Sequence, residues 1–430
     1  VEAVVNNYAS ISFNFGPTLL SWLEAHAPMA HARILLADRD SAALFGGHGS
    51  ALAQTYSHMI MPLADSRDRR TQVLWGMEDF RHRFGREPEG MWLPETAVDV
   101  PTLEEMAGAG ILFTVLEPGQ ASRYREAGEE EWHDVSDSGI DPSRPYTVNL
   151  PSGRSMALFF YDGPISRAVA FENLLEDGTV FAQRLLSGFD DGRNRPQLVH
   201  IATDGETYGH HHRHGDMALA FALRRIRRDK DVRIVNYGQY LELHPPDHEV
   251  EIREHTAWSC AHGVDRWQAD CGCRTGLNPD WNQAWRGPLR SALNHLRDRL
   301  RPPFETAAST LFHDPWEARD EYIQVLMEPG KESEDRFLAQ HASTFLDEDG
   351  RSRALNLMEL QHQAMLMFTS CGWFFDDLAG LEGVQILRYA GRAIQLAEGL
   401  FGEDFTEPFL VDLEQAESND PDAGNGLSLI

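Results

Sequence analysis

The stretch Gly90-Met91-Trp92-Leu93-Pro94-Glu95-Thr96 combines an aromatic residue, a proline and a single carboxylate. It follows a strand-like approach and leads into a helix, with Thr96 or Asp99 as N-cap and Pro101 near the first turn. In α/β barrels, catalytic groups lie at the carboxyl ends of strands, just before the next helix. The stretch therefore predicts an α/β barrel with Glu95 in its functional site.

A second strand end carries carboxylates much further along the chain. Residues 197–202 have the apolar character of a buried strand, and Asp204-Gly205-Glu206-Thr207-Tyr208-Gly209 follows them. Carboxylates at two strand ends are the groups that general acid/base and nucleophilic chemistry on a sugar requires. On an extended segment Glu206 shares a face with Asp204, where it orients Asp204, binds a sugar hydroxyl or pairs with an arginine.

Strands and helices alternate over the first half of the chain. Buried strands are predicted at 110–116, 156–161 and 232–237, with a helix at 215–228. Residues 117–145 are polar, acidic and rich in Gly and Ser, which predicts a long surface loop that is either a lid or disordered. The alternation predicts a parallel α/β architecture, and the strand-end carboxylates favour a barrel.

The second half of the chain is predicted to be helical. Pro288 suits a first helical turn, and Leu289, Leu293, Leu296 and Leu300 share one face. We therefore expect a barrel, a junction rich in Trp, His and Cys, an all-helical domain and an acidic flexible tail, at residues 1–248, 249–286, 287–415 and 416–430.

Composition excludes several classes of function. The net charge of −29 opposes nucleic acid as a partner, because phosphate contacts need basic stripes, whereas a neutral polysaccharide remains compatible. No apolar run is long enough to cross a bilayer, and four cysteines in 430 residues do not form a disulfide scaffold. We see no secretion leader and expect a cytoplasmic protein that does not act at a membrane.

At these motifs the sequence resembles glycoside hydrolase family 57, which contains α-amylase-like enzymes, 4-α-glucanotransferases and glucan branching enzymes. The family's Trp-Leu-x-Glu motif matches Trp92–Glu95, and its Asp-Gly-Glu-x-Phe/Tyr-Gly motif matches Asp204–Gly209. The segments Ser12–Leu20 and Tyr56–Leu63 also match. The resemblance covers residues 1 to about 240 and implies a (β/α)7-like, distorted TIM-type barrel. The helical half resembles an uncharacterised domain often attached to such barrels in bacteria.

The resemblance implies retaining cleavage or transfer of α-1,4-glucosidic linkages, with an α-glucan or maltooligosaccharide as substrate and no cofactor. It implies Glu95 as the nucleophile, Asp204 as the general acid/base and His58 as part of the active-site floor. A retaining mechanism needs two carboxyl groups about 5–5.5 Å apart, one ionised to attack and one protonated to release the leaving oxygen.

Two departures from the family pattern bear on function. The family's first-strand His-Gln-Pro motif has no counterpart here, so we expect a barrel whose N-terminal strand is missing. The family's second motif carries a glutamate, whereas Gly47-His48-Gly49-Ser50-Ala51 has no carboxylate. This second departure leaves a non-catalytic glucan-binding protein as an alternative.

Histidines after the second motif raise a different alternative. His210, His211, His212 and His214 follow Asp204, and deacetylases with related barrels hold a metal with Asp and His residues. A metal-dependent polysaccharide deacetylase is therefore the alternative activity. On the glycosidase interpretation, His210 hydrogen-bonds the substrate and the other histidines are solvated.

The junction also holds four potential zinc ligands, Cys260, His262, Cys271 and Cys273. Because Cys-x-Cys is not the usual Cys-x2–4-Cys knuckle, we favour buried thiols, and a zinc site remains the alternative.

Aromatic residues near the junction are expected to bind substrate. Tryptophan faces stack on pyranose rings, so Trp92, Trp258 and Trp267 are predicted subsite walls, with His262 and Asp265 at the rim of the cleft. The alternative is that these tryptophans are core residues.

Overall fold

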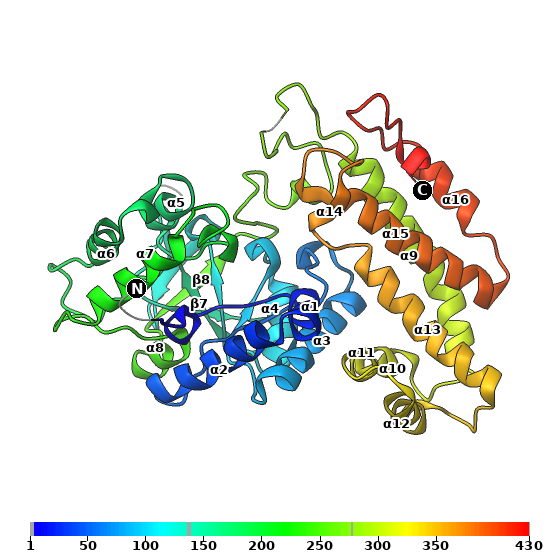
Figure 1. The fold of residues 1–430 in the computed structure, drawn as a ribbon, viewed down its shortest axis with the longest axis horizontal. Helices are drawn as coiled ribbons and strands as arrows, with labels where there is room; N and C mark the ends of the chain where they lie inside the picture. The colour runs from blue at the N-terminus through cyan, green and yellow to red at the C-terminus, as the bar shows by residue number, and fades with distance from the viewer. Residues whose placement is uncertain (1–3, 136–138, 277, 430) are drawn as a thin grey trace. The chain divides into compact units, whose positions relative to one another are not determined.

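The computed structural model describes residues 4–135, 139–276 and 278–429 (Figure 1). It divides into two compact units, each assembled from several segments. The first unit comprises Val1–Gln54, Arg83–Trp92 and Asp99–Glu254, and the second comprises Thr55–His82, Leu93–Val98 and His255–Ile430. Two segments of the predicted barrel region, Thr55–His82 and Leu93–Val98, therefore belong to the helical unit. The sequence-based prediction divided the chain into consecutive domains and did not include this exchange.

A row of parallel segments forms the centre of the first unit. β1 (Ala53–Gln54) pairs with β2 (Met91–Trp92), and β3 (Phe113–Leu116) pairs with β7 (Ser155–Phe160), both in parallel. A single bridge from Gly90 to Phe113 links the two pairs. All of β3 and nearly all of β7 are buried, as their apolar runs predict.

The two segments predicted as buried strands at 197–202 and 232–237 form no strand: residues 197–202 and 232–236 have no regular secondary structure, and α8 begins at Tyr237. The amide of Asp162 donates to the carbonyl of His200 at 2.9 Å, which sets the first of these segments beside the end of β7. The helices of the first unit are α1 (Pro17–His26), α2 (Pro28–Leu44), α4 (Val100–Gly108), α5 (Gly163–Phe171), α6 (Gly178–Leu186), α7 (Gly215–Ile226) and α8 (Tyr237–Leu243).

The segment predicted as a long surface loop is partly a sheet. It contains β4 (Ala121–Glu126) and β5 (His133–Asp134), and the six-stranded order is β3-β7-β6-β8-β4-β5, with β6 (Tyr146–Asn149) and β8 (His248–Ile252). Two cross-strand ion pairs stabilise β4 against β8: Arg123 with Glu251 at 2.7 Å and Arg125 with Glu249 at 2.6 Å. The polar residues of 117–145 suggested a loop, but Arg123 and Arg125 pair with glutamates of β8, more than a hundred residues later in the chain.

The parallel row and its helices form the (β/α)-barrel-like fold that the sequence predicts. In the part of the chain that the structure describes, the strands do not close into a complete barrel.

The second unit is helical, as predicted. Its long helices α9, α13 and α15 lie alongside one another (Figure 1). The helices are α3 (Ser66–Phe84, all but its last two residues), α9 (Arg286–Ala308), α10 (Pro315–Glu321), α11 (Ile323–Met327), α12 (Lys331–His341), α13 (Glu348–Leu366), α14 (Cys371–Phe374), α15 (Leu381–Phe401) and α16 (Thr406–Leu413). No helix in the described ranges combines the length and apolar character needed to cross a membrane.

Buried polar contacts attach α3 to the helical core. Arg319 Nη1 lies 2.7 Å from Asp68 Oδ1, and both side chains are almost fully buried. The Trp75 indole donates to the carbonyl of Arg319 at 3.1 Å. A buried ion pair is costly to break, because either partner alone is a desolvated charge. These contacts explain why this early segment belongs with the C-terminal helices.

The sequence predicts a flexible tail at 416–430, of which the structure describes residues 416–429; these fold back on the second unit. Ala416 is fully buried, and Ser418 and Asn419 donate to the carboxylate of Asp377 at 2.7 and 2.6 Å. Its acidic, Gly-rich composition concealed these anchoring residues.

Candidate active site

Glu95 lies in a strained turn that follows β2 in the chain. Within η3 (Pro94–Thr96), φ is 58° at Glu95 and 51° at Thr96. A positive φ is uncommon outside glycine and especially unfavourable for a β-branched residue such as threonine. Strain of this kind costs about 1–3 kcal/mol per residue and persists at functional sites when the surroundings hold it.

Main-chain contacts from a distant segment hold the turn. The amide of Trp258 donates to the carbonyl of Glu95 at 3.0 Å, and the Val98 amide donates to the carbonyl of Thr256, also at 3.0 Å. The Thr96 hydroxyl donates to the Glu95 carbonyl at 2.7 Å. All of these residues belong to the second unit, so the turn is fixed within it.

The same segment positions the Glu95 carboxylate, which is half-buried. Trp258 Nε1 donates to Glu95 Oε2 at 3.0 Å, and Ser259 Oγ donates to the same oxygen at 2.5 Å. Both hydrogen bonds that reach this carboxylate in the described residues go to Oε2, which leaves Oε1 for reaction. Two donors on one oxygen hold the carboxylate in a fixed orientation, as a positioned nucleophile requires.

His58 and Cys371 lie in the same unit. Desolvation of the thiol, and then the charge of Glu95, raises the pKa of Cys371, a residue that is exposed overall; the influence of this charge places Cys371 near Glu95. The neighbouring Ser370 hydroxyl lies 2.6 Å from His58 Nδ1, and His58 has a φ of 53°. The predicted floor residue His58 thus contacts the residue next to Cys371.

Trp267 is not a subsite wall. It is 0% exposed, in the core beside α9, and Arg290 Nε donates to its carbonyl at 2.8 Å. The short helix η7 (Asp265–Trp267) turns this side chain inward, so the alternative of a core residue holds. Asp265 is half-buried and accepts a hydrogen bond from Gln268 at 3.0 Å.

Asp204 belongs to the first unit, where it precedes η6 (Gly205–Thr207) and is exposed. Burial and then the charges of Glu117 and Asp204 raise the pKa of Tyr161. Glu117 directly follows β3 and Tyr161 directly follows β7. Asp204 therefore lies in a polar group at the carboxyl ends of these two parallel strands, where the fold concentrates functional residues.

Glu117 is a site candidate that the sequence reasoning missed. Burial raises its pKa, and its Oε2 accepts from the Gly119 amide at 2.7 Å. The signal was available, because Glu117 immediately follows a buried strand. Asp162, two residues after the end of β7, is the N-cap of α5 and accepts from the Ile165 amide at 2.8 Å.

The other predicted substrate-binding residues of the first unit differ in their exposure to solvent. Glu206 and His210 are exposed, and Trp92 is half-buried in β2. After burial, the charge of Glu206 raises the pKa of Tyr8. In the described ranges, the set of side chains with metal-binding geometry includes neither Asp204 nor the histidines at 210–214, so the ligand arrangement gives the deacetylase alternative no support.

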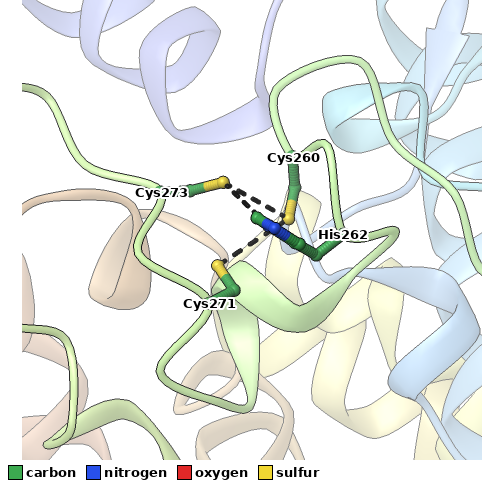
Figure 2. A group of neighbouring side chains, drawn as sticks. All are labelled: Cys260, His262, Cys271 and Cys273. Carbon is green, nitrogen blue, oxygen red and sulfur yellow. Dashed lines mark hydrogen bonds between the residues drawn. The ribbon is translucent and has the colours of Figure 1, made fainter.

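That set is formed by the four junction residues that the sequence offers as potential zinc ligands. Cys260 is buried, and Cys271 and Cys273 are half-buried. Figure 2 shows Cys260, His262, Cys271 and Cys273 pointing toward one another. Their ligand atoms all lie within 4.8 Å of one another, and none of the cysteines is in a disulfide. Cys-x-His and Cys-x-Cys come from two arms of one loop, an arrangement that a rule on spacing within one segment does not test. His262 is therefore a member of this cluster and not simply a rim residue.

Comparison with known proteins identifies the domains. Residues 46–253 match the model of glycosyl hydrolase family 57, and residues 281–429 match a domain of unknown function, DUF3536. The chain thus carries a family 57 glycoside hydrolase domain, followed by this helical domain. No curated protein sequence matches the chain.

Solved structures share the fold at low sequence identity. An exo-type maltose-forming amylase from Pyrococcus sp. ST04 has a TM-score of 0.71 and 15% identity, over 94% of this chain and 70% of the amylase. A 4-α-glucanotransferase from Thermococcus litoralis has a TM-score of 0.54 and 14% identity, over 91% and 54%. A GH57-type branching enzyme from Pyrococcus horikoshii has a TM-score of 0.53 and 16% identity, over 92% and 73%.

Proposed function

We propose that the chain is a retaining glycosidase or transglycosidase of α-glucans, with Glu95 as the nucleophile and Asp204 as the general acid/base. The observation that carries the proposal is the Glu95 carboxylate, which is held in a strained turn by Trp258 and Ser259. The family 57 domain and the likeness to amylase, glucanotransferase and branching enzyme support the α-glucan substrate.

In the first step, Glu95 Oε1 attacks the anomeric carbon as the protonated Asp204 carboxyl gives its proton to the departing glycosidic oxygen. The product is a covalent glucosyl ester of Glu95 with inverted configuration. The donors on Oε2 hold the carboxylate in one orientation, so that little reorganisation is needed at the moment of attack.

In the second step, the ionised Asp204 removes a proton from water or from a sugar hydroxyl. The resulting oxygen attacks the same carbon and displaces Glu95, which restores the original configuration. Water gives hydrolysis, and a glucan hydroxyl gives transfer. The same residues serve both outcomes, so access of water to the ester decides between them.

The test is incubation of the full chain with maltooligosaccharides and with amylose, followed by chromatography of the products. New oligosaccharides or branches, lost in Glu95→Gln and in Asp204→Asn, are expected. Products longer than the substrate identify a transferase, and only shorter ones identify a hydrolase. Binding of glucan without turnover by the wild type would instead identify a glucan-binding protein.

Loss of one donor to Glu95 is expected to slow the reaction. A hydrogen bond to a charged group contributes about 1.5–3 kcal/mol, so Ser259→Ala should lower kcat by roughly 10–100-fold with little change in KM. Steady-state kinetics on a maltooligosaccharide measure this effect. Ser309→Ala, at an exposed serine in the same unit, is the matched control and should retain wild-type kcat. Equal kcat in both variants would show that Ser259 does not position Glu95.

A further inference from the structure

We propose that Cys260, His262, Cys271 and Cys273 bind one zinc ion, and that this ion fixes the loop that positions Glu95. The first part stands independently of the proposed function, whereas the second part rests on it.

Three distances among the four side chains match those of a tetrahedral zinc site, and all ligand atoms lie within 4.8 Å of one another. Cys260 Sγ lies 3.9 Å from Cys271 Sγ and 3.8 Å from Cys273 Sγ, and Cys273 Sγ lies 3.6 Å from His262 Nδ1. With Zn–S near ~2.3 Å and Zn–N near ~2.0–2.1 Å, tetrahedral angles require separations of roughly 3.8 Å between sulfurs and 3.6 Å between sulfur and nitrogen. The side chains converge on one point from both arms of the loop (Figure 2).

The donor set specifies the kind of metal and its role. Three thiolates and an imidazole are the ligands of structural zinc, and hard cations such as Ca²⁺ and Mg²⁺ prefer oxygen. Four protein ligands complete a tetrahedral shell and leave no open position for water or substrate. The ion therefore acts on structure, and the glucosidic chemistry stays with the carboxylates.

Charge around the cluster supports the same assignment. Arg286 is 0% exposed and donates to the Cys273 carbonyl at 2.7 Å, and its other hydrogen bonds also go to carbonyls. Arg266 is buried and donates to the Ser259 carbonyl at 3.1 Å. Over the described residues, neither guanidinium is hydrogen-bonded to a carboxylate. Buried cations need a nearby negative charge; the buried Asp376 acts on Arg286, and zinc with three thiolates and a neutral histidine would add a net charge of −1 beside both guanidinium groups.

The chain connects this cluster directly to Glu95. Trp258 and Ser259, which hold the Glu95 carboxylate, immediately precede Cys260. The loop has only short regular elements of its own, so a metal ion bound to its two arms would add to the restraint that its buried residues, such as Trp267, already provide. Loss of the ion would release both donors together.

Metal analysis of the purified full chain tests the site. After exposure to ZnCl₂ and gel filtration, we expect about one zinc per chain, from the single closed site. Cys271→Ser and Cys273→Ser should lose the zinc, and Cys371→Ser, the cysteine outside the cluster, should keep it. Circular dichroism shows whether a variant is folded. If a variant unfolds, the zinc content of the wild type still decides whether the site exists. Zinc below a tenth of an equivalent in the wild type, or retained by the Cys271→Ser/Cys273→Ser double variant, would overturn the proposal.

A double-mutant cycle tests the link to Glu95. We expect Cys273→Ser to lower kcat by roughly 10–100-fold with little change in KM, the size of effect that loss of the charge-assisted donors implies. In a Trp258→Phe/Ser259→Ala background, the same change should add much less, because the positioning is already lost. Fully additive losses would refute the link. Glu95→Gln should bind zinc like the wild type but show no turnover. This result, with an active wild type, would show that metal binding and catalysis are separable.

Discussion

Glu95→Gly is expected to abolish turnover of maltooligosaccharides while leaving the fold intact. Removal of a covalent nucleophile should lower kcat by about 10⁴-fold or more. Glycine adopts a positive φ without strain, so the substitution relieves the turn, in which Glu95 has a φ of 58°. We therefore expect a melting temperature no lower than that of the wild type, measured beside the kinetics.

Rescue by azide distinguishes loss of the nucleophile from other causes of inactivity. A small anion fits the space left by the carboxylate and attacks the anomeric carbon from the same face. With α-glucosyl fluoride and azide, Glu95→Gly should form β-glucosyl azide, the inverted product. Glu95→Gln, which fills the space, is the control and should not be rescued. A Glu95→Gly protein that keeps wild-type kcat would remove Glu95 from the mechanism.

Asp204→Ala is expected to show a loss that depends on the leaving group. General acid catalysis contributes about 10²–10⁴-fold, so kcat/KM on maltooligosaccharides should fall by that factor. Fluoride leaves without protonation, so formation of the glucosyl-enzyme from α-glucosyl fluoride should slow by much less. Azide needs no general base, and it should release the intermediate as α-glucosyl azide, with retained configuration.

The stereochemistry of the azide product thus distinguishes the two carboxylates. Glu117→Gln is the matched control, because Glu117 lies in the same polar group as Asp204 at the strand ends. In the Glu117→Gln variant, the ratio of the rates on maltooligosaccharides and on α-glucosyl fluoride should remain that of the wild type. If Glu117→Gln shows the pattern expected for Asp204→Ala, Glu117 is the acid and the assignment of Asp204 is wrong.

The predictable features were those carried by local pattern. The apolar runs at β3 and β7 predicted buried strands of the barrel-like part. The leucines on one face of α9 predicted the helical part. Asp99 caps α4 by accepting from the Thr102 amide at 2.8 Å, as its position before Pro101 predicts.

Contacts between distant segments were not predictable in this way. The turn at Glu95 depends on Trp258, and nothing near Glu95 in sequence indicates that a non-glycine pair adopts a positive φ there. The four potential zinc ligands could be named from the sequence, but their convergence could not be predicted, because a spacing rule tests one segment and two arms of a loop supply these side chains. Trp267 was misassigned because aromatic composition does not report which side chain faces the core.

Covalent trapping tests the central claim most directly. 5-Fluoro-α-glucosyl fluoride reacts with a retaining enzyme but slows the release of the glucosyl ester, because fluorine destabilises the oxocarbenium-like transition state. Arg86 and Arg123 bracket a tryptic peptide of residues 87–123 that contains Glu95. We expect mass spectrometry to find one added fluoroglucosyl group, on this peptide, with fragmentation placing it at Glu95. An adduct on any other residue, or none in a protein that turns over α-glucan, would contradict Glu95 as the nucleophile.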